Sequence, residues 1–428
     1  MQGCSQTTTD ARSRLQALQD FVIGKSRHRD HGAAGSLKLR ARLFLKALLS
    51  IVFQRRRAIE AVDCDVLLVH PSRKSFRLGR KQALLAALRG RGLVVEEFVE
   101  EGDFDLVRSK QFVAPASGVP TLLRWDAAHA AYLLSRYRAK VIVTERNGWI
   151  VPSLIKLQRK TGARIVHLAH SIPSDESSRY DYFDYDYYLL FGKSSLEYLS
   201  ALGGAFGECI VKFAGPYFFA DREGPLPVKA RNEGKGVKCL FLGSGPDYEV
   251  SEPYRDYCGW ITTWLSAQPA AELWVKVHPR GSGEPWRSQA VSNSGIRILP
   301  PDSVLDECVG DFDFVLSGYT NAVLDVSRFG TPFILLGEGA DYFSTERFGI
   351  SRARSAMELA NYIDALLADV QRARETASKF FDFHVHEKYL PLTSMVNVIE
   401  RLAAGGEVKG LPLSSSSGEL LRGSWISD

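Results

Sequence analysis

Short apolar runs alternate with amphipathic segments along most of the chain, and this alternation predicts strands and helices in turn. A buried strand (Cys64–Ser72) precedes a helix (Gly79–Arg89) and a second strand (Leu93–Val99), and the same alternation continues to Phe218. Strands separated by helices of this length are typical of a parallel sheet that is covered on both faces. We therefore predict a first α/β domain over residues 63–222.

A linker without periodic pattern interrupts this alternation. Residues 219–236 are rich in glycine, proline and charge, and a second series of strand and helix patterns occupies residues 237–371. The fold class that we predict is α/β, with two Rossmann-like parallel-sheet domains that face a central cleft. Residues 372–410 are predicted as C-terminal helices, and the Ser- and Gly-rich residues 411–428 as a disordered tail.

The first 62 residues predict a polar segment followed by a basic amphipathic helix. Residues 37–60 carry apolar side chains at helical spacing, and no acidic residue occurs there before Glu60. Their basic residues are Lys38, Arg40, Arg42, Lys46, Arg55, Arg56 and Arg57. Such a helix suits the surface of an anionic membrane. The alternative is a helix packed on the domain with its basic face in solvent.

Polar clusters follow the predicted strands where each strand ends, and ligands bind at these ends in open parallel sheets. The clusters are His70–Ser72, Glu145–Gly148, His170–Ser171, Gly215–Pro216, Gly243–Gly245, His278–Arg280, Ser317–Asn321 and Gly337–Gly339.

The stretch from Leu273 to Leu336 carries the strongest signal for a ligand. An apolar run ends at His278-Pro279-Arg280, and a later strand enters the polar turn Ser317–Asn321 before a short helix, Ala322–Phe329. A helix that starts directly after a strand directs free N–H groups and partial positive charge beyond the strand end, which suits a phosphate. The alternative is ordinary helix capping by these polar residues.

Composition narrows the class of protein. The chain has 428 residues, 45% hydrophobic and 24% charged, with a net charge of +5, which is ordinary for a globular protein and argues against nucleic acid as a partner. Six scattered cysteines without a CxxC pair argue against a zinc site and a disulfide framework. We found neither a bilayer-spanning apolar run nor a signal-peptide pattern. We expect a cytoplasmic location, or peripheral attachment to the inner face of the cytoplasmic membrane.

These motifs resemble GT-B glycosyltransferases over roughly residues 63–370. The most similar branch comprises bacterial polysialyl- and sialyltransferases, capsule Kdo transferases and CDP-glycerol glycerophosphotransferases. UDP-GlcNAc 2-epimerase has the same fold. In the sialyl- and polysialyltransferases, an HP motif and a Ser-rich motif hold the CMP part of the donor. His278-Pro279 looks like the first motif and Ser317–Asn321 like the second.

The resemblance also has departures. The second motif has one serine where the polysialyl family tends to have two, which leaves phosphate contacts to Thr320 or Asn321. The segment from Ser317 to Pro332 is similar to a segment of the epimerase. When the two segments are aligned, Asp325 falls where an acidic residue binds the nucleotide ribose, so the resemblance implies that role for Asp325. The epimerase has a glutamate before this position, but no glutamate precedes Ser171 here, which argues against the epimerase interpretation.

Sugar transfer with inversion requires a base for the acceptor hydroxyl and groups that neutralise the leaving phosphate. Glu145 is the first candidate base, since burial at a strand end could raise its pKa, and the alternative is a carboxylate paired with Arg146 or Arg164. His170 is the second candidate. The candidate residues for the donor nucleotide and phosphate are Ser244, Gly245, His278, Pro279, Arg280, Ser317, Gly318, Thr320, Asn321, Asp325 and Glu338. Helix N-termini and cations can hold the phosphate, so we predict no metal and no other cofactor.

The predicted function is transfer of a sugar, or a sugar-like group, from a CMP- or CDP-linked donor to a bacterial surface polysaccharide or lipid-linked acceptor. Two alternatives stay open: a UDP-sugar 2-epimerase-like enzyme, and a non-catalytic nucleotide-binding α/β protein.

Overall fold

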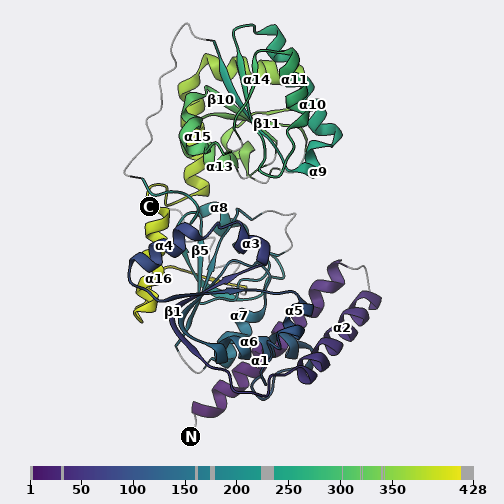
Figure 1. Ribbon diagram of the computed structural model, residues 1–428, viewed down its shortest axis with the longest axis vertical. Coiled ribbons are helices and arrows are strands. Elements are labelled where there is room, and N and C mark those ends of the chain that lie inside the picture. The colour runs from purple at the N-terminus through teal and green to yellow at the C-terminus, as the bar shows by residue number, and fades with distance from the viewer. Residues whose placement is uncertain are drawn as a thin grey trace. The chain divides into compact units, whose positions relative to one another are not determined.

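The computed structural model (Figure 1) divides into two compact units. Unit 1 comprises Met1–Phe191, Ser195–Asp221 and Leu390–Asp428, and unit 2 comprises Gly192–Ser194 and Arg222–Tyr389. The residues that the structure describes are 3–29, 33–159, 162–173, 179–222, 236–300, 302–318, 320, 322–338, 341 and 343–415.

Within the described residues, unit 1 is built on a seven-stranded sheet of order β13-β6-β5-β4-β3-β1-β2. Neighbouring strands are parallel, except that β13 pairs antiparallel with β6. The strands are β1 (Val62–His70), β2 (Val95–Val99), β3 (Tyr137–Thr144), β4 (Arg164–Leu168), β5 (Tyr187–Leu190), β6 (Glu208–Phe213) and β13 (Leu411–Ser414).

Helices cover both faces of this sheet (Figure 1). Residues of α4 and α16 pack with β1, β3, β4 and β5 in one apolar core, and α6 packs with both α2 and α7 elsewhere in the unit. The helices are α1 (Gly3–Arg29), α2 (Ala33–Val52), α3 (Arg73–Arg77), α4 (Gln82–Gly90), α5 (Asp103–Arg108), η1 (Thr121–Leu123), α6 (Arg124–Arg136), α7 (Val151–Gln158), α8 (Lys193–Ala201) and α16 (Pro391–Ala403).

The described part of unit 2 has a six-stranded sheet, parallel throughout, of order β12-β11-β10-β7-β8-β9. Its strands are β7 (Lys238–Leu242), β8 (Glu272–Lys276), β9 (Ile296–Ile298), β10 (Phe314–Ser317), β11 (Phe333–Leu336) and β12 (Arg352–Ala353). Its helices are α9 (Pro246–Glu249), α10 (Glu252–Ala267), α11 (Glu284–Ser292), α12 (Leu305–Cys308), η2 (Val309–Asp311), α13 (Ala322–Ser327), η3 (Thr345–Phe348), α14 (Ala356–Ala368) and α15 (Val370–His384).

Each sheet reverses its strand order once. In unit 1 the chain runs outward from β1 to β2, and then outward in the other direction from β3, so the reversal lies between β1 and β3. In unit 2 the reversal lies between β7 and β10. Loops diverge at such a point and leave a crevice at the carboxyl ends of the two strands, where open α/β sheets bind ligands.

The structure corrects one prediction for the C-terminal part of the chain. Residues 411–414, predicted as part of a disordered tail, form β13, because an open edge of β6 offers its backbone groups for pairing. The predicted C-terminal helices are present as α15 and α16, of which α15 belongs to unit 2 and α16 to unit 1. The remainder of the tail, from residue 416, lies outside the described residues.

The N-terminal prediction also changes. The polar segment that precedes the basic helix contains a long helix, α1. The basic helix is shorter than predicted, because α2 ends at Val52 and residues 54–60 have no helical structure. Arg55, Arg56 and Arg57 therefore follow the helix as exposed residues.

Candidate functional site

Glu145 lies directly after β3, at the reversal point of the unit 1 sheet, and its side chain is buried. One carboxylate oxygen lies 2.5 Å from Nζ of Lys81 and accepts a hydrogen bond from Ser75 at 3.1 Å. The other oxygen accepts a hydrogen bond from the hydroxyl of Tyr217 at 2.7 Å. We call Glu145, Lys81, Ser75 and Tyr217, together with His170, the Glu145 cluster. Its members come from loops and helices that follow β1, β3, β4 and β6.

The charge state of Glu145 follows from these partners. Burial acts to raise the pKa of Glu145, but the charge of Lys81 and the hydrogen bonds from Lys81 and Tyr217 outweigh it, so the pKa is lowered. This direction is opposite to the first expectation from the sequence and fits the alternative, a carboxylate paired with a cation. The partner also differs, because Arg146 contacts Glu100 instead of Glu145. Glu145 is therefore an ionised, hydrogen-bonded carboxylate at neutral pH.

His170 adds a neutral base to the same cluster. Burial lowers the pKa of His170, the charge of Glu145 raises it, and the charge of Lys81 lowers it again. The net direction is downward, so the imidazole is neutral at pH 7. Its Nδ1 is buried and has no hydrogen-bond partner among the described residues. A neutral imidazole beside an ionised carboxylate can take up a proton, because the carboxylate stabilises the imidazolium that forms.

A second carboxyl lies at the same edge of the sheet. Glu100 follows β2, is buried beside the guanidinium of Arg146, and donates its main-chain N–H to the carbonyl of His70 at 2.9 Å. Burial raises the pKa of Glu100 to about 7, although the charge of Arg146 opposes this. Glu100 thus titrates near neutrality, as an acid–base group would.

Sequence reasoning missed four residues of this edge: Lys81, Ser75, Tyr217 and Glu100. Tyr217 follows Gly215-Pro216, a strand end that had been singled out, and Ser75 and Lys81 follow His70–Ser72. In the sequence, Lys81 is one of several basic residues in a row, and such a residue is usually exposed. Only the fold shows that its side chain is buried, with 2% exposed.

In unit 2, Ser244 and Gly318 meet at the reversal point of the sheet. Ser244 follows β7 and Gly318 follows β10, and a Cβ atom on Gly318 would lie 3.7 Å from Oγ of Ser244. Glycine at 318 thus leaves room for an approaching ligand, because a larger side chain would fill the space beside Ser244.

His278 and Arg280 join this site from the loop after β8. A Cβ atom on Gly245 would lie 3.8 Å from the guanidinium of Arg280, which places Arg280 beside the loop after β7. The main-chain N–H of Arg280 donates to Nδ1 of His278 at 3.1 Å. Burial and the charge of Arg280 lower the pKa of His278, so its ring is neutral with Nδ1 as acceptor. The ring proton must then sit on Nε2, which is a donor.

We call Ser244, Gly245, Gly318, His278 and Arg280 the strand-end site of unit 2. It combines a hydroxyl, an imidazole N–H donor and a guanidinium with two glycines, whose backbone a ligand can approach closely. These groups suit an anion such as a phosphate. Pro279 lies between His278 and Arg280 and fixes the turn that brings them together.

Other predicted donor residues have different surroundings. Ser317 is fully buried and donates to the carbonyl of Gly318, and Thr320 accepts from the N–H of Ala322 and so caps α13. Asp325 lies on α13 near Asp306 and Arg328, and burial and the charge of Asp306 raise its pKa to about 7. Glu338 is exposed after β11. Asn321 lies outside the described residues.

Gly337 supports the strand-end site of unit 2 through Tyr257. Gly337 has a φ of +85°, and a Cβ there would lie 1.8 Å from the hydroxyl oxygen of Tyr257. Tyr257 also lies beside Gly318 and shares a 2.8 Å hydrogen bond with Tyr248. One buried ring thus packs against the ends of both β10 and β11.

We expect Gly337→Ala to lower the free energy of unfolding of unit 2 by about 2–3 kcal/mol, through steric overlap and a strained φ. Gly349→Ala is the matched control, because Gly349 has a φ of +67° and no atom within 4 Å of an added Cβ. The control should cost about 1 kcal/mol in urea unfolding. Equal losses in the two variants would mean that Tyr257 does not constrain Gly337.

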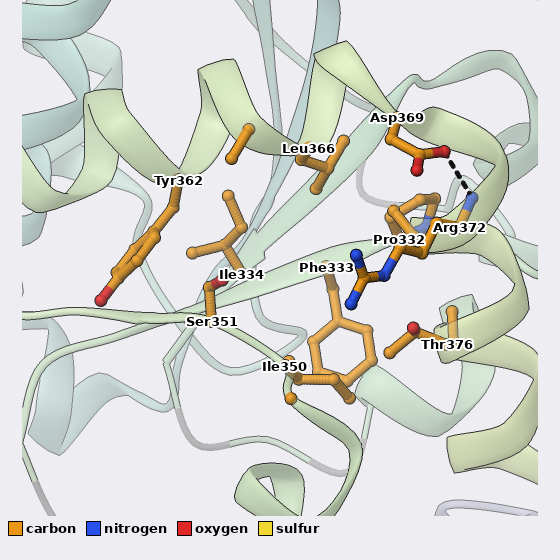
Figure 2. Close-up of a pocket in the computed structure, with 14 residues that line it drawn as sticks. Pro332, Phe333, Ile334, Ile350, Ser351, Tyr362, Leu366, Asp369, Arg372 and Thr376 are labelled. Carbon is orange, nitrogen blue, oxygen red and sulfur yellow. Dashed lines mark hydrogen bonds between the residues drawn. The ribbon is translucent and has the colours of Figure 1, made fainter.

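A pocket of about 250 Å³ in unit 2 lies apart from this site (Figure 2). Its lining includes Pro332 and Phe333 at the start of β11, and Ile350 and Ser351 before β12, with side chains of α14 and α15. It therefore opens at the amino ends of these strands. None of the candidate donor residues lines it.

Among the described residues, no group of three or more His, Cys, Asp or Glu side chains is arranged to hold a metal ion. No helix in the described part of the chain has both the length and the apolar character needed to cross a bilayer.

Comparisons with known proteins give matches at the level of structure. No protein-family model matches the sequence, and no curated protein matches it. A co-structure of S. aureus MnaA with UDP has a TM-score of 0.51 at 11% identity, covering 81% of this chain and 98% of that chain. UDP-GlcNAc 2-epimerase from Neisseria meningitidis bound to UDP-GlcNAc has a TM-score of 0.48 at 8% identity, covering 80% and 100%. A glycotransferase of kitacinnamycin has a TM-score of 0.49 at 14% identity, covering 80% and 100%.

At these identities, the similarity concerns the fold alone. The predicted fold class is confirmed for each unit, since both contain a mainly or wholly parallel sheet with helices, and the cleft between the units stays a prediction. The chain therefore has a two-domain α/β fold, the GT-B fold, and is similar in this fold to S. aureus MnaA.

Proposed function

We propose that this protein is a glycosyltransferase that uses a nucleotide-activated sugar. The observation that carries the proposal is the strand-end site of unit 2, where Ser244 and Gly318 meet at the reversal point of a parallel sheet beside His278 and Arg280. The guanidinium of Arg280 supplies positive charge to the phosphate of the leaving nucleotide, and the Nε2–H of His278 donates a hydrogen bond to it. No metal ion is needed for that role, because the protein supplies the charge and the donors.

The Glu145 cluster of unit 1 supplies the proton acceptor. His170 is neutral at pH 7 and Glu145 is ionised, so the pair can accept the proton of an acceptor hydroxyl and stabilise the resulting charge. In this proposal Glu145 and His170 act as one unit, and Tyr217 and Ser75 orient the carboxylate.

The proposed donor is CMP- or CDP-linked, as the resemblance of His278-Pro279 and Ser317–Asn321 to sialyltransferase motifs implies. The proposed acceptor is a bacterial surface polysaccharide or a lipid-linked glycan, reached from the cytoplasm with peripheral contact between residues 37–60 and an anionic membrane. A UDP-dependent enzyme is the second candidate, because the solved structure with the same fold, S. aureus MnaA, holds UDP.

The nucleotide is identified by thermal shift with CMP, CDP, UDP, GDP and ADP. We expect a cytidine nucleotide to stabilise the wild type most, by about 3 kcal/mol at a roughly hundredfold excess over its dissociation constant. His278→Ala should remove most of this stabilisation, because it removes the Nε2 donor and the acceptor of the Arg280 N–H. His386→Ala, which changes an exposed histidine of the same unit, should leave the shift unchanged.

Each other outcome has a definite meaning. Preferential stabilisation by UDP would favour the second candidate, and conversion of a UDP-sugar without an acceptor would identify an epimerase. Nucleotide binding without any turnover of donor would indicate a binding protein. If no nucleotide shifts the transition, the strand-end site of unit 2 is only a well-capped set of turns, and the proposal fails.

A further inference from the structure

The outer side of α2 carries an unusual concentration of exposed apolar side chains. Among the described residues, six of the sixteen exposed large hydrophobic side chains belong to this one helix, with exposed fractions between 44% for Leu48 and 71% for Val52. They are Leu37, Phe44, Leu45, Leu48, Ile51 and Val52. Exposed apolar residues are normal when scattered singly, whereas a contiguous group indicates an interaction surface.

The spacing places these six side chains on one stripe of the helix. Residues 37, 44, 48 and 51 follow one another at intervals of three, four or seven, and such positions share a face of an α-helix. The stripe runs from Leu37 to Val52, or roughly 22 Å at the rise of an α-helix. We call it the outer face of α2.

The opposite face of the same helix is already occupied. Ala47 and Ser50 are buried, and Leu49 packs on the cluster that contains Phe112 and Trp125. Lys46 is tied to the protein by an ion pair with Asp103 at 2.7 Å and lies over the ring of Trp125. The fold therefore fixes which side of α2 faces outward.

Basic side chains border the outer face. At 100° per residue, Lys38 and Arg42 fall along one edge of the stripe and Arg40 along the other. The residues directly after the helix, Arg55–Arg57, are exposed as well. Asp103 reaches Arg42 at 3.7 Å, and no acidic residue occurs between residues 33 and 59. An apolar stripe with cationic borders is complementary to the acyl boundary and the anionic headgroups of a membrane surface.

We propose that the outer face of α2 binds anionic lipid bilayers, with its apolar stripe in the interface and its basic borders on the headgroups. A second copy of the chain is a poorer occupant, because a symmetric contact would bring two sets of basic side chains together. This inference deepens the proposed function and rests on it, because a lipid-linked acceptor is the reason why the enzyme would bind a membrane. The binding itself requires neither donor nor acceptor.

Vesicle co-sedimentation of the full chain tests the proposal, with phosphatidylcholine vesicles that contain or lack about one-third phosphatidylglycerol. We expect binding to the anionic vesicles at low salt and a strong decrease at high salt. Arg40→Glu should weaken binding more than fivefold, since each basic side chain near such a surface contributes a factor of about five. Lys379→Glu is the matched control, because it makes the same charge change at an exposed position on α15.

A second variant pair tests the apolar stripe. Phe44→Ser combined with Leu48→Ser should weaken binding by about tenfold or more, because both side chains would be buried in the interface. Val291→Ser, on an 89% exposed residue of α11, should leave binding unchanged. The variants must match the wild type in melting temperature and in the shift that a nucleotide induces. Vesicle binding can then fail while nucleotide binding is kept, so a failure of membrane binding is distinguished from a failure of the proposed function.

Two results would overturn the proposal. The first is absence of binding to anionic vesicles, or equal binding by the Phe44/Leu48 variant and the wild type. The second is concentration-dependent self-association without lipid that the Phe44/Leu48 variant loses, because the outer face of α2 would then be an interface between copies of the chain.

Discussion

Lys81→Met should lower the free energy of unfolding of unit 1 by about 3–5 kcal/mol, the range expected when one partner of a buried ion pair is removed. Lys81 is 2% exposed, and its Nζ lies 2.5 Å from Glu145. Methionine fills a similar volume, so the loss reports the unpaired carboxylate more than a cavity. Hydrogen exchange of the amides in β1 and β3 measures the effect in unit 1 directly.

The loss should depend on pH with a definite sign. In the wild type the pKa of Glu145 is lowered, so its stabilising contribution is present above the pKa of the unfolded chain and disappears as the pH falls. Without Lys81, burial raises that pKa, and ionisation then destabilises the folded state increasingly as the pH rises. The difference between variant and wild type should therefore be larger at pH 8 than at pH 5.

Lys140→Met is the matched control for this experiment. Lys140 makes an ion pair with Asp65 at 2.7 Å in the same unit, but its side chain is 61% exposed. Removal of such a surface pair should cost less than about 1 kcal/mol. Combining Lys81→Met with Glu145→Gln should recover part of the loss. A loss of similar size in Lys81→Met and Lys140→Met would show that the buried pair is not formed as described.

Glu145→Gln should decrease glycosyl transfer by about 10²–10⁴, the usual contribution of a positioned acid–base group. Glutamine keeps the shape of the side chain but removes the charge that would stabilise a protonated His170. The measurement is release of CMP or CDP from cytidine-activated donors per folded enzyme, followed over pH. In the wild type, the acidic limb of the profile should report a group titrating below 6.5, the direction given by the lowered pKa of His170.

Glu208→Gln serves as the control, because it neutralises a half-exposed carboxylate of unit 1. His170→Gln should resemble Glu145→Gln in magnitude, and the double variant should lose little more than either single variant, since the two residues act together. If the folded Glu145→Gln variant retained more than a tenth of the wild-type rate, the cluster would be structural only.

The sequence is sufficient to predict those parts of the fold that depend on local pattern. Apolar runs identify β1, β3, β8 and β10, since β1, β3 and β10 are buried on both faces over much of their length and β8 on one face. Polar residues after the runs mark the strand ends. Glu145, Ser244 and His278 were recognised in this way. The prediction succeeds where the signal lies within about ten consecutive residues.

The partners of these residues could not be predicted, because they depend on packing between distant segments. Lys81 reaches Glu145 only because the turn before α4 lies over the end of β3, and nothing in the local pattern marks one lysine of a basic stretch as buried. For the same reason, the sequence left open whether burial raises the pKa of Glu145 or a paired cation lowers it. Strand β13 was missed because its partner, β6, lies far away along the chain.

The return of the chain to unit 1 has a consequence for biosynthesis. Met395, Ile399 and Leu402 of α16 are buried in the core of unit 1 together with residues of β1 and β3, and β13 closes the edge of the same sheet. These elements leave the ribosome after the whole of unit 2. Unit 2 can therefore complete its core during translation, whereas unit 1, although its first strands are made earlier, must wait for α16 and β13. A stalled or clipped chain that lacks α16 would expose an apolar surface, and protein quality control would recognise it.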